Sequence, residues 1–562
     1  MPSPHSRPDP NPVLRQDISY NEGGEATPAT VVEAFVSRVR DLGDAVAIRD
    51  QHLDPALTWR EYGAMAHRAA AGLRAAGVVP GDTVGLLLSN RPEFHVADVA
   101  ALLAGATPFS LYQTCAPAQL AEILRNANCR VVITEAGLAR ALDAALDLDG
   151  VPVQHVVTVG TESWGRLLSD TDTGLLATSG TSRTLPCPTD AATVIYTSGT
   201  TGAPKGVVLT HRSILSTTTA LAQRLGMRRD NWSVSYLPMA HIAERISTHY
   251  SHILVGSTVV CCPDQARLIP VLKDVQPEIF FAPPRIWEKL QALTAGERAA
   301  GTDHVHIRRG IGLARSEVAL TGAAPCPPGV IEYFHGIGVP LREIYGMSET
   351  SGVISLGEVD DIGSVGKPFP GTEVRIADDG ELLVRGPSVM VGYRARPDAT
   401  AAALDGAGWL HTGDVGQIDG DGRIRIVDRK KDLIINSSGK NMSPANIEAR
   451  LRESGHLIDH ACVIGDGRPY NVALIVVDPV AAETFPGLDE LTVALWADID
   501  RANQRLARVE QVKRFTVLPG PWHPGSDELT PTMKLRRSKI MEKYAGQIEE
   551  LYAARRTRAV MK

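Results

Sequence analysis

A ten-residue segment rich in glycine and hydroxyl side chains constrains this chain more than any other feature of its sequence. It reads Thr-Ser-Gly-Thr-Thr-Gly-Ala-Pro-Lys-Gly over residues 197–206, and apolar runs of strand length precede and follow it at 192–196 and 207–209. Glycines allow positive φ and let backbone N–H groups approach an anion closely. The hydroxyl groups and the lysine add donors and a positive charge. The segment therefore predicts a strand–loop–strand unit that wraps phosphate oxygens.

The loop differs from a Walker A loop, in which a Gly-Lys-Ser/Thr sequence opens a helix. Here Lys205 is followed by Gly206 and a β-like run. Taken alone, the segment has a second interpretation as a flexible surface loop, and the partial copy at 178–182 shows how easily part of the pattern arises. That copy lacks the Pro-Lys-Gly ending, so we interpret it as linker.

Length and composition set the class of protein. The chain has 562 residues, which exceeds one ordinary core, so at least two domains are expected. Hydrophobic residues are 44% and charged residues 22% of the total, as in globular proteins. A net charge of −7 and a pI of about 6.2 speak against nucleic acid as the partner. The 7 scattered cysteines show no metal or disulfide spacing and are expected to be buried.

The sequence shows no pattern that is typical of a signal peptide or a transmembrane helix. Residues 1–17 have no apolar core of a signal peptide, and no run of about 18 apolar residues predicts a transmembrane helix. These features predict a cytoplasmic protein. Basic residues near the end of the chain suggest weak peripheral contact with anionic lipid at the inner face of the membrane, although a solvated helix end is the favoured interpretation. These residues are Arg555, Arg556, Arg558 and Lys562.

Apolar runs alternate with helical patterns along the first half of the chain. Thr58-Trp-Arg-Glu61 is a capping-box pattern that predicts a helix to Ala76, and 92–104 also looks helical. The buried-strand candidates are 84–88, 130–134, 233–237, 258–262 and 279–281. Such alternation predicts α/β layers. Residues 170–190 are predicted to form a surface loop.

The pattern of apolar runs changes after Gly363, where the runs become short and are separated by Asp-Gly pairs. Asp-Gly-Asp-Gly at 419–422 predicts a β-hairpin. The charged segment 428–432 marks a domain boundary. We therefore predict an α/β protein with three parts. These are a flexible tail at 1–30, a large multi-subdomain N-terminal domain with mixed sheets and a small β-rich subdomain at 31–429, and a smaller, mobile α/β lid domain at 430–562.

Five further motifs follow the phosphate loop in a fixed order. They are Thr-Gly-Ala-Ala-Pro at 321–325, Glu-Ile-Tyr-Gly-Met-Ser-Glu at 343–349, Gly-Trp-Leu-His-Thr-Gly-Asp at 408–414, Asp-Arg-Lys-Lys at 428–431 and Thr-Pro-Thr-Met-Lys-Leu-Arg at 530–536. Together with the loop, this series resembles the adenylate-forming superfamily over roughly residues 30–550. That superfamily includes acyl-CoA synthetases, luciferases and peptide-synthetase adenylation domains.

The resemblance implies a site for ATP and Mg²⁺. Adenine would lie along the 322–324 turn and Tyr345, the ribose hydroxyls would bind Asp414, and Arg429 would contact the same nucleotide. Mg²⁺ would bind Glu349 and Thr197, as a hard cation that prefers oxygen ligands. The residues implied in ATP binding are Thr197, Ser198, Gly199, Thr200, Thr201, Gly202, Lys205, Gly322, Ala323, Ala324, Glu343, Ile344, Tyr345, Gly346, Ser348, Asp414 and Arg429.

The remaining roles also come from the resemblance. The implied catalytic residues are Lys534, Glu349 and His241. Lys534 would stabilise the charge that builds on phosphoryl oxygens in the transition state. Lys431 would be the hinge of the lid. The path of the thiol substrate would pass Ser438, Gly439 and Lys440.

Three stretches narrow the resemblance to long-chain fatty acyl-CoA synthetases. They are Tyr-Leu-Pro-Met-Ala-His-Ile-Ala-Glu-Arg at 236–245, Phe-Ala-Pro-Pro-Arg-Ile-Trp-Glu-Lys at 281–289 and Gly-Lys-Asn-Met-Ser-Pro at 439–444. The implied reaction joins a medium- to long-chain fatty acid to CoA through acyl-AMP, releasing AMP and pyrophosphate. Only residues 290–320 separate two motifs that lie further apart in that group, and Ser438 replaces a frequent glycine. The acyl chain length therefore stays open.

Two alternatives remain. A fatty acyl-AMP ligase would load a carrier protein and would carry an insertion before the hinge, which we do not identify in the sequence. A catalytically silent nucleotide-binding protein would show a broken lysine, magnesium or phosphate motif, and none of these motifs is visibly broken.

Overall fold

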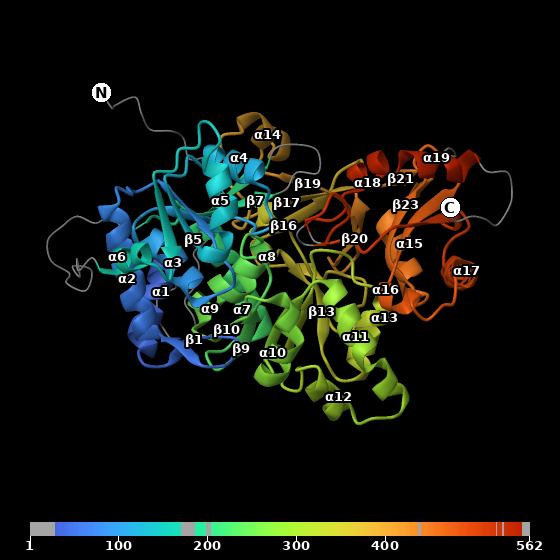
Figure 1. The fold of residues 1–562 in the computed structure, drawn as a ribbon, viewed down its shortest axis with the longest axis horizontal. Coiled ribbons are helices and arrows are strands. Elements are labelled where there is room, and N and C mark those ends of the chain that lie inside the picture. The colour runs from blue at the N-terminus through green and yellow to red at the C-terminus, as the bar shows by residue number, and fades with distance from the viewer. Residues whose placement is uncertain are drawn as a thin grey trace.

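The structure is a computed structural model that describes residues 28–169, 186–197, 204–436, 440–523, 525–530 and 533–553. The structure contains two large sheets, whose strands interleave along the chain, a four-stranded sheet and a C-terminal α/β part (Figure 1). The α/β class predicted from the alternation is confirmed. Most of the loop predicted at 170–190 and the basic residues after 553 lie outside the described residues. No helix in the described part of the chain is long and apolar enough to cross a membrane.

The nine-stranded sheet has the order β15-β14-β13-β12-β11-β9-β10-β1-β2. Its strands are β1 Val46–Arg49, β2 Pro55–Thr58, β9 Trp232–Ser235, β10 Thr258–Cys261, β11 Ile279–Ala282, β12 Val318–Thr321, β13 Leu341–Tyr345, β14 Ser355–Leu356 and β15 Lys367–Pro368. The seven-stranded sheet has the order β18-β8-β7-β4-β3-β5-β6. Its strands are β3 Thr83–Leu87, β4 Thr107–Ser110, β5 Val131–Glu135, β6 His155–Val159, β7 Ala191–Thr197, β8 Lys205–Thr210 and β18 Gly392–Tyr393.

Helices surround these two sheets. They are α1 Val31–Leu42, α2 Trp59–Ala75, α3 Pro92–Leu103, α4 Pro117–Ala127, α5 Ala139–Leu146, α6 Glu162–Ser169, α7 His211–Leu225, α8 Ile242–Glu244, α9 Ser251–Val255, α10 Leu268–Val275, α11 Pro284–Ala299, α12 His304–Gly310, α13 Pro328–Gly336 and α14 Pro397–Ala403. A π-helical turn, η3 Arg245–Tyr250, joins α8 to α9. The capping box predicted at Thr58 is confirmed, with Glu61 as its partner at the start of α2.

Residue alternation along the strands explains the layers. Successive strand residues point to opposite faces of a sheet. In β11, Ile279 and Phe281 join the largest core cluster with α1, α2, α3 and α7, whereas Phe280 packs with α10, α11 and α13. In β5, Ile133 belongs to that same largest cluster, and Val132 packs with α4 and α5 on the outside. One helical layer is therefore sandwiched between the two sheets, and one covers each outer face.

The four-stranded sheet follows with the order β16-β17-β19-β20. Its strands are β16 Glu373–Ile376, β17 Glu381–Arg385, β19 Leu410–Ile418 and β20 Ile424–Arg429. The predicted hairpin at 419–422 is confirmed, because β19 and β20 pair antiparallel with Ile418 opposite Ile424. This small sheet is the β-rich unit expected after Gly363, and its last strand leads into the C-terminal part.

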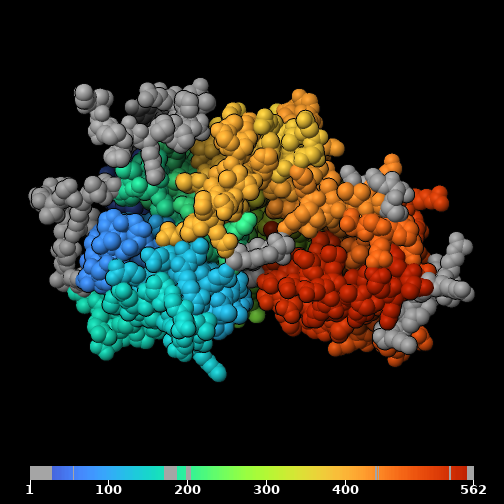
Figure 2. All heavy atoms as spheres, turned by 90° about the horizontal axis from the view of Figure 1, so that it is seen from above, coloured from blue at the N-terminus to red at the C-terminus, as the bar shows by residue number. Residues whose placement is uncertain are grey.

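The C-terminal part is a three-stranded sheet between two helical layers. It contains β23 Ile458–Ile464, β24 Asn471–Val477 and β25 Val512–Leu518, together with the small ladder of β21 Ile434–Ile435 and β22 Asn441–Met442. Its helices are α15 Pro444–Glu453, α16 Pro479–Ala482, α17 Leu488–Gln504, α18 Arg537–Lys543 and α19 Ala545–Ala553. Seen from above, this orange-to-red part occupies one end of the molecule and abuts the segment that holds the four-stranded sheet (Figure 2).

Cysteine burial follows the prediction with one exception. Six of the cysteines are buried, and burial raises the pKa of Cys115 to about 11 and that of Cys262 to about 11. Cys187 is exposed, so the prediction that it is buried is wrong. Cys187 stands in the turn before β7, where Asp190 accepts a hydrogen bond from its backbone N–H at 2.8 Å. Residue 187 therefore belongs to a surface turn that is held by its backbone, and its side chain is left exposed.

Buried histidines predict acid-sensitive stability. Burial, the largest cause, lowers the pKa of His252 to about 3 and that of His211 to about 4. An unfolded histidine binds a proton below about pH 6.5, so the unfolded chain takes up protons that the folded chain does not. Stability is therefore fully present above about pH 6.5 and is lost as the pH falls toward 3 to 4, by up to about 2 kcal/mol per group at pH 5. Urea unfolding at pH 7.5 and pH 5 measures this loss, and equal midpoints would contradict it.

Candidate active site

The segments predicted to bind ATP and the acid meet at one edge of the nine-stranded sheet. Strands β9, β11, β12 and β13 run parallel. The stretch 236–241 follows β9, the stretch 283–289 follows β11, the turn 322–324 follows β12, and 346–349 follows β13. The carboxyl ends of parallel strands lie at the same edge, where open α/β sheets bind ligands. Topology alone therefore gathers these four motifs.

The turn after β12 is forced close to β13. A Cβ on Gly322 would lie 2.8 Å from the backbone oxygen of Ile344, so only glycine fits there. Ala323 adopts φ +66°, a left-handed conformation that costs a non-glycine residue roughly 1–2 kcal/mol. Ala324 is exposed, and the Ile344 side chain packs against the main core. The turn thus presents small groups and backbone to the edge, as a flat base requires.

Tyr345, Asp414 and Arg429 form one hydrogen-bonded group. The Tyr345 hydroxyl donates to Asp414 Oδ2 at 2.5 Å, and Arg429 Nε lies 2.8 Å from Asp414 Oδ1. Asp414 and Arg429 are opposite each other in the β19–β20 hairpin, which fixes their pairing. Burial raises the pKa of Asp414, although Arg429 opposes that effect. The Asp414 carboxylate is thus oriented by the Tyr345 hydroxyl on one side and by the Arg429 guanidinium on the other.

The other residues of the 343–349 motif point in different directions. The Glu343 carboxylate accepts a hydrogen bond from Gly363 N at 3.2 Å, and burial raises its pKa to about 7. A Cβ on Gly346 would lie 2.2 Å from the Gly352 oxygen, so close backbone contact requires glycine there. Ser348 begins the single turn that carries Glu349. Glu343 therefore holds the loop at Gly363, whereas the Glu349 carboxylate contacts β18.

Glu349 is linked to the phosphate loop through a tyrosine that sequence analysis missed. The Tyr393 hydroxyl donates to Glu349 Oε1 at 2.8 Å, and Lys205 Nζ stands 5.0 Å from the centroid of the Tyr393 ring. Lys205 opens β8, opposite Thr197 at the end of β7, and the Thr197 hydroxyl donates to the Lys205 oxygen at 3.4 Å. The predicted strand–loop–strand unit is therefore an antiparallel pair whose ends carry Thr197 and Lys205.

Gly206 has a different role from the one expected. The glycine-rich pattern predicts positive φ at Gly206, but Gly206 lies in β8 and is not among the residues with positive φ. A Cβ at this position would lie 2.9 Å from two ring atoms of Tyr196 and 2.9 Å from Val194. The requirement is steric, because the paired strand β7 fills the space beside it. Sequence spacing does not reveal that neighbour.

His241 caps α8, and this capping determines its tautomer. Its Nδ1 accepts a hydrogen bond from Ala243 N at 3.2 Å. Burial, with a smaller contribution from Lys534, lowers the pKa of His241 to about 3, so the ring is neutral near pH 7. A neutral imidazole that accepts at Nδ1 carries its hydrogen on Nε2. His241 therefore presents a hydrogen-bond donor at Nε2 near pH 7.

A buried polar network holds the stretch that leads to His241. Glu244 accepts hydrogen bonds from Leu237 N at 3.2 Å and from Thr248 Oγ1 at 2.6 Å. Asn90 Nδ2 donates to Ser235 Oγ at 2.9 Å and to the Leu237 oxygen at 2.8 Å. Burial raises the pKa of Glu244 to about 7. This network fixes the strand exit from β9, and Asn90 had no signal in the sequence that linked it to the motif.

Lys534 is placed by a tight turn in the C-terminal part. Thr530 and Lys534 exchange hydrogen bonds: Thr530 N donates to the Lys534 oxygen at 2.8 Å, and Lys534 N donates to Thr530 Oγ1 at 3.0 Å. Met533 takes φ +63° between them, a strained conformation of a kind that clusters at functional sites. The Lys534 side chain is exposed to solvent, yet it interacts electrostatically with charged groups on other segments of the chain.

The surroundings of Lys534 change its pKa. Desolvation by the surrounding protein, the largest cause, and the positive Arg429 lower the pKa of Lys534 to about 8, while Asp414 and Glu349 oppose them. Lys534 in turn contributes to the low pKa of His241. The side chain is nevertheless accessible to water. The structure thus brings Lys534, Asp414, Glu349 and His241 around one space.

Ion pairs hold the C-terminal part in this arrangement. Arg285, at the start of α11, donates to Glu288 at 2.9 Å and also pairs with Asp459 of β23. Glu288 lies 3.6 Å from Arg452 of α15. These four charges alternate in sign across the boundary between the two parts of the chain. They stabilise the position in which Lys534 faces the sheet edge.

Comparisons with known proteins agree with this geometry. The family model of the AMP-binding enzyme matches residues 35–394, and the model of the AMP-binding enzyme C-terminal domain matches 431–556. The chain belongs to the AMP-binding enzyme family. The resemblance to the adenylate-forming superfamily is thereby confirmed.

Several proteins that are similar to this AMP-binding enzyme are named as acyl-CoA ligases or synthetases. It is 43% identical over 426 residues to the putative fatty-acid–CoA ligase fadD11 of Mycobacterium tuberculosis, covering 65% of the chain and 74% of that relative. It is 33% identical over 548 residues to the long-chain-fatty-acid–CoA ligase FadD15 of Mycobacterium bovis, covering 86% and 90%. A solved Mycobacterium tuberculosis fatty acyl CoA synthetase matches with a TM-score of 0.66 and 25% identity, covering 92% and 99%. The anthranilate CoA ligase AuaEII has the same fold, with a TM-score of 0.77 at 20% identity over 93% and 99%.

The carboxylate of Glu349 suits Mg²⁺ that arrives with a nucleotide. Glu349 is buried, and Tyr393 occupies only its Oε1. In the described part of the AMP-binding enzyme, no group of three or more His, Cys, Asp and Glu side chains is placed to hold a metal. Mg²⁺ commonly takes one or two carboxylates and completes its shell with waters and substrate phosphates. The Glu349 carboxylate therefore fits a Mg²⁺ that shares its ligands with a nucleotide.

The remaining predicted residues are partly accounted for. Lys431 is exposed in the turn between β20 and β21. Lys440 is exposed, and its N–H donates to Asn436 Oδ1 at 3.0 Å. The predicted phosphate-loop residues Ser198, Gly199, Thr200, Thr201 and Gly202, and the thiol-path residues Ser438 and Gly439, lie outside the described residues.

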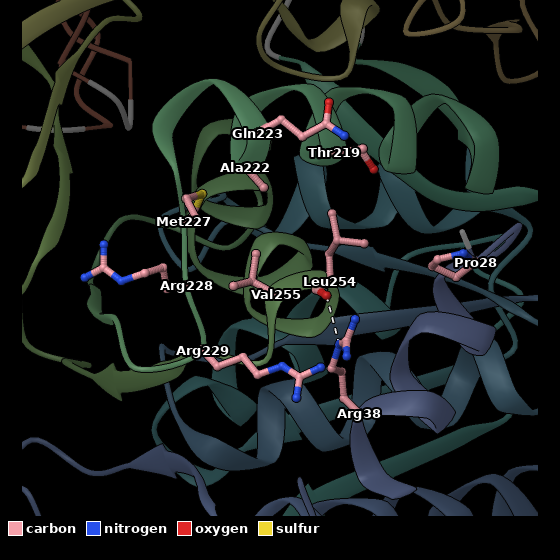
Figure 3. Close-up of a pocket in the computed structure, with 10 residues that line it drawn as sticks. All are labelled: Pro28, Arg38, Thr219, Ala222, Gln223, Met227, Arg228, Arg229, Leu254 and Val255. Atoms are coloured by element: carbon pink, nitrogen blue, oxygen red, sulfur yellow. Dashed lines mark hydrogen bonds between the residues drawn. The ribbon is translucent and has the colours of Figure 1, made fainter. Parts of the chain in front are cut away.

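A separate cavity of about 250 Å³ lies between α1, α7 and α9 of this AMP-binding enzyme (Figure 3). Met227, Leu254 and Val255 contribute apolar surface to it. Arg38 also lines it and donates from Nε to the Leu254 oxygen at 3.0 Å. Among the described residues, none of those predicted for the site lines this cavity. It is a different feature from the sheet edge.

Proposed function

We propose that this protein is a fatty-acid–CoA ligase that forms acyl-AMP from ATP and a medium- to long-chain fatty acid and then transfers the acyl group to CoA. The names and coverage of the relatives support the reaction class. The observation that carries the proposal is the convergence of Lys534, Asp414, Glu349 and His241 around the sheet edge. These groups come from both parts of the chain.

In the first step, a fatty-acid carboxylate oxygen attacks the α-phosphorus of ATP. The bond from that phosphorus to the bridging oxygen breaks, and pyrophosphate leaves. Lys534 places positive charge where negative charge builds on the phosphoryl oxygens. His241 donates from Nε2 to an oxygen of the acid, and Asp414 accepts hydrogen bonds from the ribose. Mg²⁺ held by Glu349 and Thr197 would neutralise phosphate charge.

In the second step, the CoA thiol releases its proton to solvent, its sulfur forms a bond to the acyl carbonyl carbon, and the bond from that carbon to the phosphate oxygen breaks as AMP leaves. One site then serves both steps if the C-terminal part turns and takes Lys534 away. We propose residues 31–429 and 430–562 as the two domains, Lys431 as the hinge, and Ser438, Gly439 and Lys440 as the thiol path. The exposure of Lys431 and Lys440 supports this, and such gating by domain motion is common in enzymes.

The CoA acceptor is favoured over a carrier protein because the relatives are named as CoA ligases. The test is a panel of acids from acetate to a C18 fatty acid with ATP and Mg²⁺, with and without CoA. We expect AMP formation that needs both a fatty acid and CoA. Acyl-AMP that accumulates whether or not CoA is present would support carrier loading instead. Absence of nucleotide consumption with every acid would contradict the proposed function.

A further inference from the structure

Residues 388–394 form a strap between the phosphate loop and the turn that carries Glu349. Met390 N donates to the Glu349 backbone oxygen at 2.8 Å, and Ser351 Oγ donates to the Ser388 oxygen at 2.8 Å. On its other side the strap pairs with β8, where Arg394 N donates to the Gly206 oxygen at 2.8 Å. The strap therefore fixes the exit of the phosphate loop relative to the carboxylate.

Tyr393 is the side chain of this strap that touches both functional groups. Its hydroxyl donates to Glu349 Oε1 at 2.8 Å, while its ring face lies 5.0 Å from Lys205 Nζ. A cation over an aromatic face within about 6 Å is attracted to the ring. A phenol hydroxyl is protonated near pH 7, so it acts as the donor to the carboxylate. One half-buried side chain thus orients a carboxylate and an ammonium together.

The backbone that carries Tyr393 is itself pinned. Arg394, the next residue, donates from its guanidinium to the Ala127 oxygen at 2.7 Å, and Asn126 Nδ2 donates to the Arg394 oxygen at 3.3 Å. Asn126 also accepts a hydrogen bond from the Tyr196 hydroxyl at 2.8 Å, on the strand that enters the phosphate loop. These contacts leave Tyr393 little freedom to turn away from Glu349 and Lys205.

We propose that Tyr393 is a positioning residue that couples the phosphate-binding Lys205 to the magnesium-binding carboxylate of Glu349. The proposal rests on the proposed function, because both groups must reach one triphosphate. The hydroxyl and the ring have separable effects: the hydroxyl holds Glu349 for Mg²⁺, and the ring holds Lys205 for phosphate. Removing an outer hydrogen-bond partner of a metal ligand typically costs 10- to 100-fold in metal affinity.

The test measures ATP binding by calorimetry, without acid or CoA, at increasing Mg²⁺ and also in EDTA. Tyr393→Phe keeps the ring and removes the hydroxyl. We expect it to raise the Mg²⁺ concentration needed for tight ATP binding by about tenfold, while binding in EDTA stays unchanged. Tyr393→Leu removes both contacts and is expected to weaken binding in EDTA as well, by about two- to fivefold. Val391→Ala, on the same strap at a side chain that is 62% exposed, should match the wild-type protein.

The variants separate coupling from other causes. If Tyr393→Phe binds Mg²⁺ and ATP as the wild type does, or if both Tyr393 variants lose ATP equally in EDTA, the coupling is overturned. Urea midpoints of the variants exclude general unfolding, and Tyr393→Phe alone decides the hydroxyl contribution if Tyr393→Leu is unfolded. A wild-type protein that binds no ATP would instead overturn the proposed function itself.

Discussion

Lys534→Ala is expected to slow acyl-AMP formation strongly while transfer from supplied acyl-AMP to CoA survives. The ammonium group contributes only where charge builds on the phosphoryl oxygens, so its loss should lower the rate of the first step by about 10²–10³. The second step does not break a bond to phosphorus and has no need of it. Pyrophosphate release measures the first step, and acyl-CoA formed from synthetic acyl-AMP measures the second. Equal loss of both would contradict the assignment.

The matched control is Lys539→Ala on α18. Lys539 is an exposed lysine of the same part of the chain, and Glu542 lies 3.4 Å from it. Its removal changes the same net charge but should leave both steps unchanged. Loss of the first step in this variant would indicate that overall charge, and not the position of Lys534, governs the reaction.

Lys534 also gives the first step a distinct pH dependence. Its pKa is lowered to about 8, so the ammonium form is lost as the pH rises through 8 in the free enzyme. The ratio kcat/KM reports groups of the free enzyme, and it should therefore fall above pH 8. In Lys534→Arg the charge persists, because arginine stays protonated in this range, and the fall should disappear whatever the absolute rate.

Much of the fold was predictable from local sequence patterns. The capping box at Thr58 and the Asp-Gly hairpin at 419–422 depend on neighbours within a few residues, and both are present. The order of strands and helices follows from the same periodicity. Gly206 could not be explained in this way. Glycine is required at this position because the ring of Tyr196 on the paired strand β7 leaves no room for a Cβ, and not because the backbone has positive φ.

The site was predictable where a motif carries its own chemistry, and less so where partners come from elsewhere. Tyr393 is 44 residues from Glu349 in sequence, and Asn90 is 145 residues from Ser235. Neither Tyr393 nor Asn90 stands at a sequence spacing that indicates its partner, so the sequence gives no signal for these two contacts. His241 was assigned by resemblance, but its tautomer depends on the N–H of Ala243 and could be known only from the structure.

Arg245 gives the predicted acyl-pocket stretch 236–245 a structural role as well. It ends the stretch 236–245 that resembles an acyl-pocket segment, yet its side chain is wholly buried. It pairs with Asp98 of α3, donates to Ser110 Oγ at 2.8 Å and donates to the Tyr250 hydroxyl at 2.6 Å. The pair ties the turn after His241 to the helical layer between the two sheets.

Asp98→Ala is expected to destabilise this layer strongly. The Asp98 carboxylate also accepts a hydrogen bond from His249 Nε2 at 2.8 Å, and its own side chain is 0% exposed. Burial raises the pKa of Asp98, but Arg245 and His249 outweigh burial and lower it, so the carboxylate is ionised near pH 7. Removing it leaves a buried guanidinium without its counter-charge, which costs about 3–5 kcal/mol. The free energy of unfolding in urea measures this loss.

The double variant Asp98→Leu with Arg245→Met distinguishes a lost charge from lost packing. It removes both charges together and replaces them with apolar groups, so it should be more stable than Asp98→Ala, since a buried ion pair replaced as a unit is often close to neutral. Glu317→Ala serves as the control, because its pair with Arg228 is half-exposed and should shift the urea midpoint little. A double variant as unstable as Asp98→Ala would mean that shape, and not the uncompensated charge of Arg245, holds the layer together.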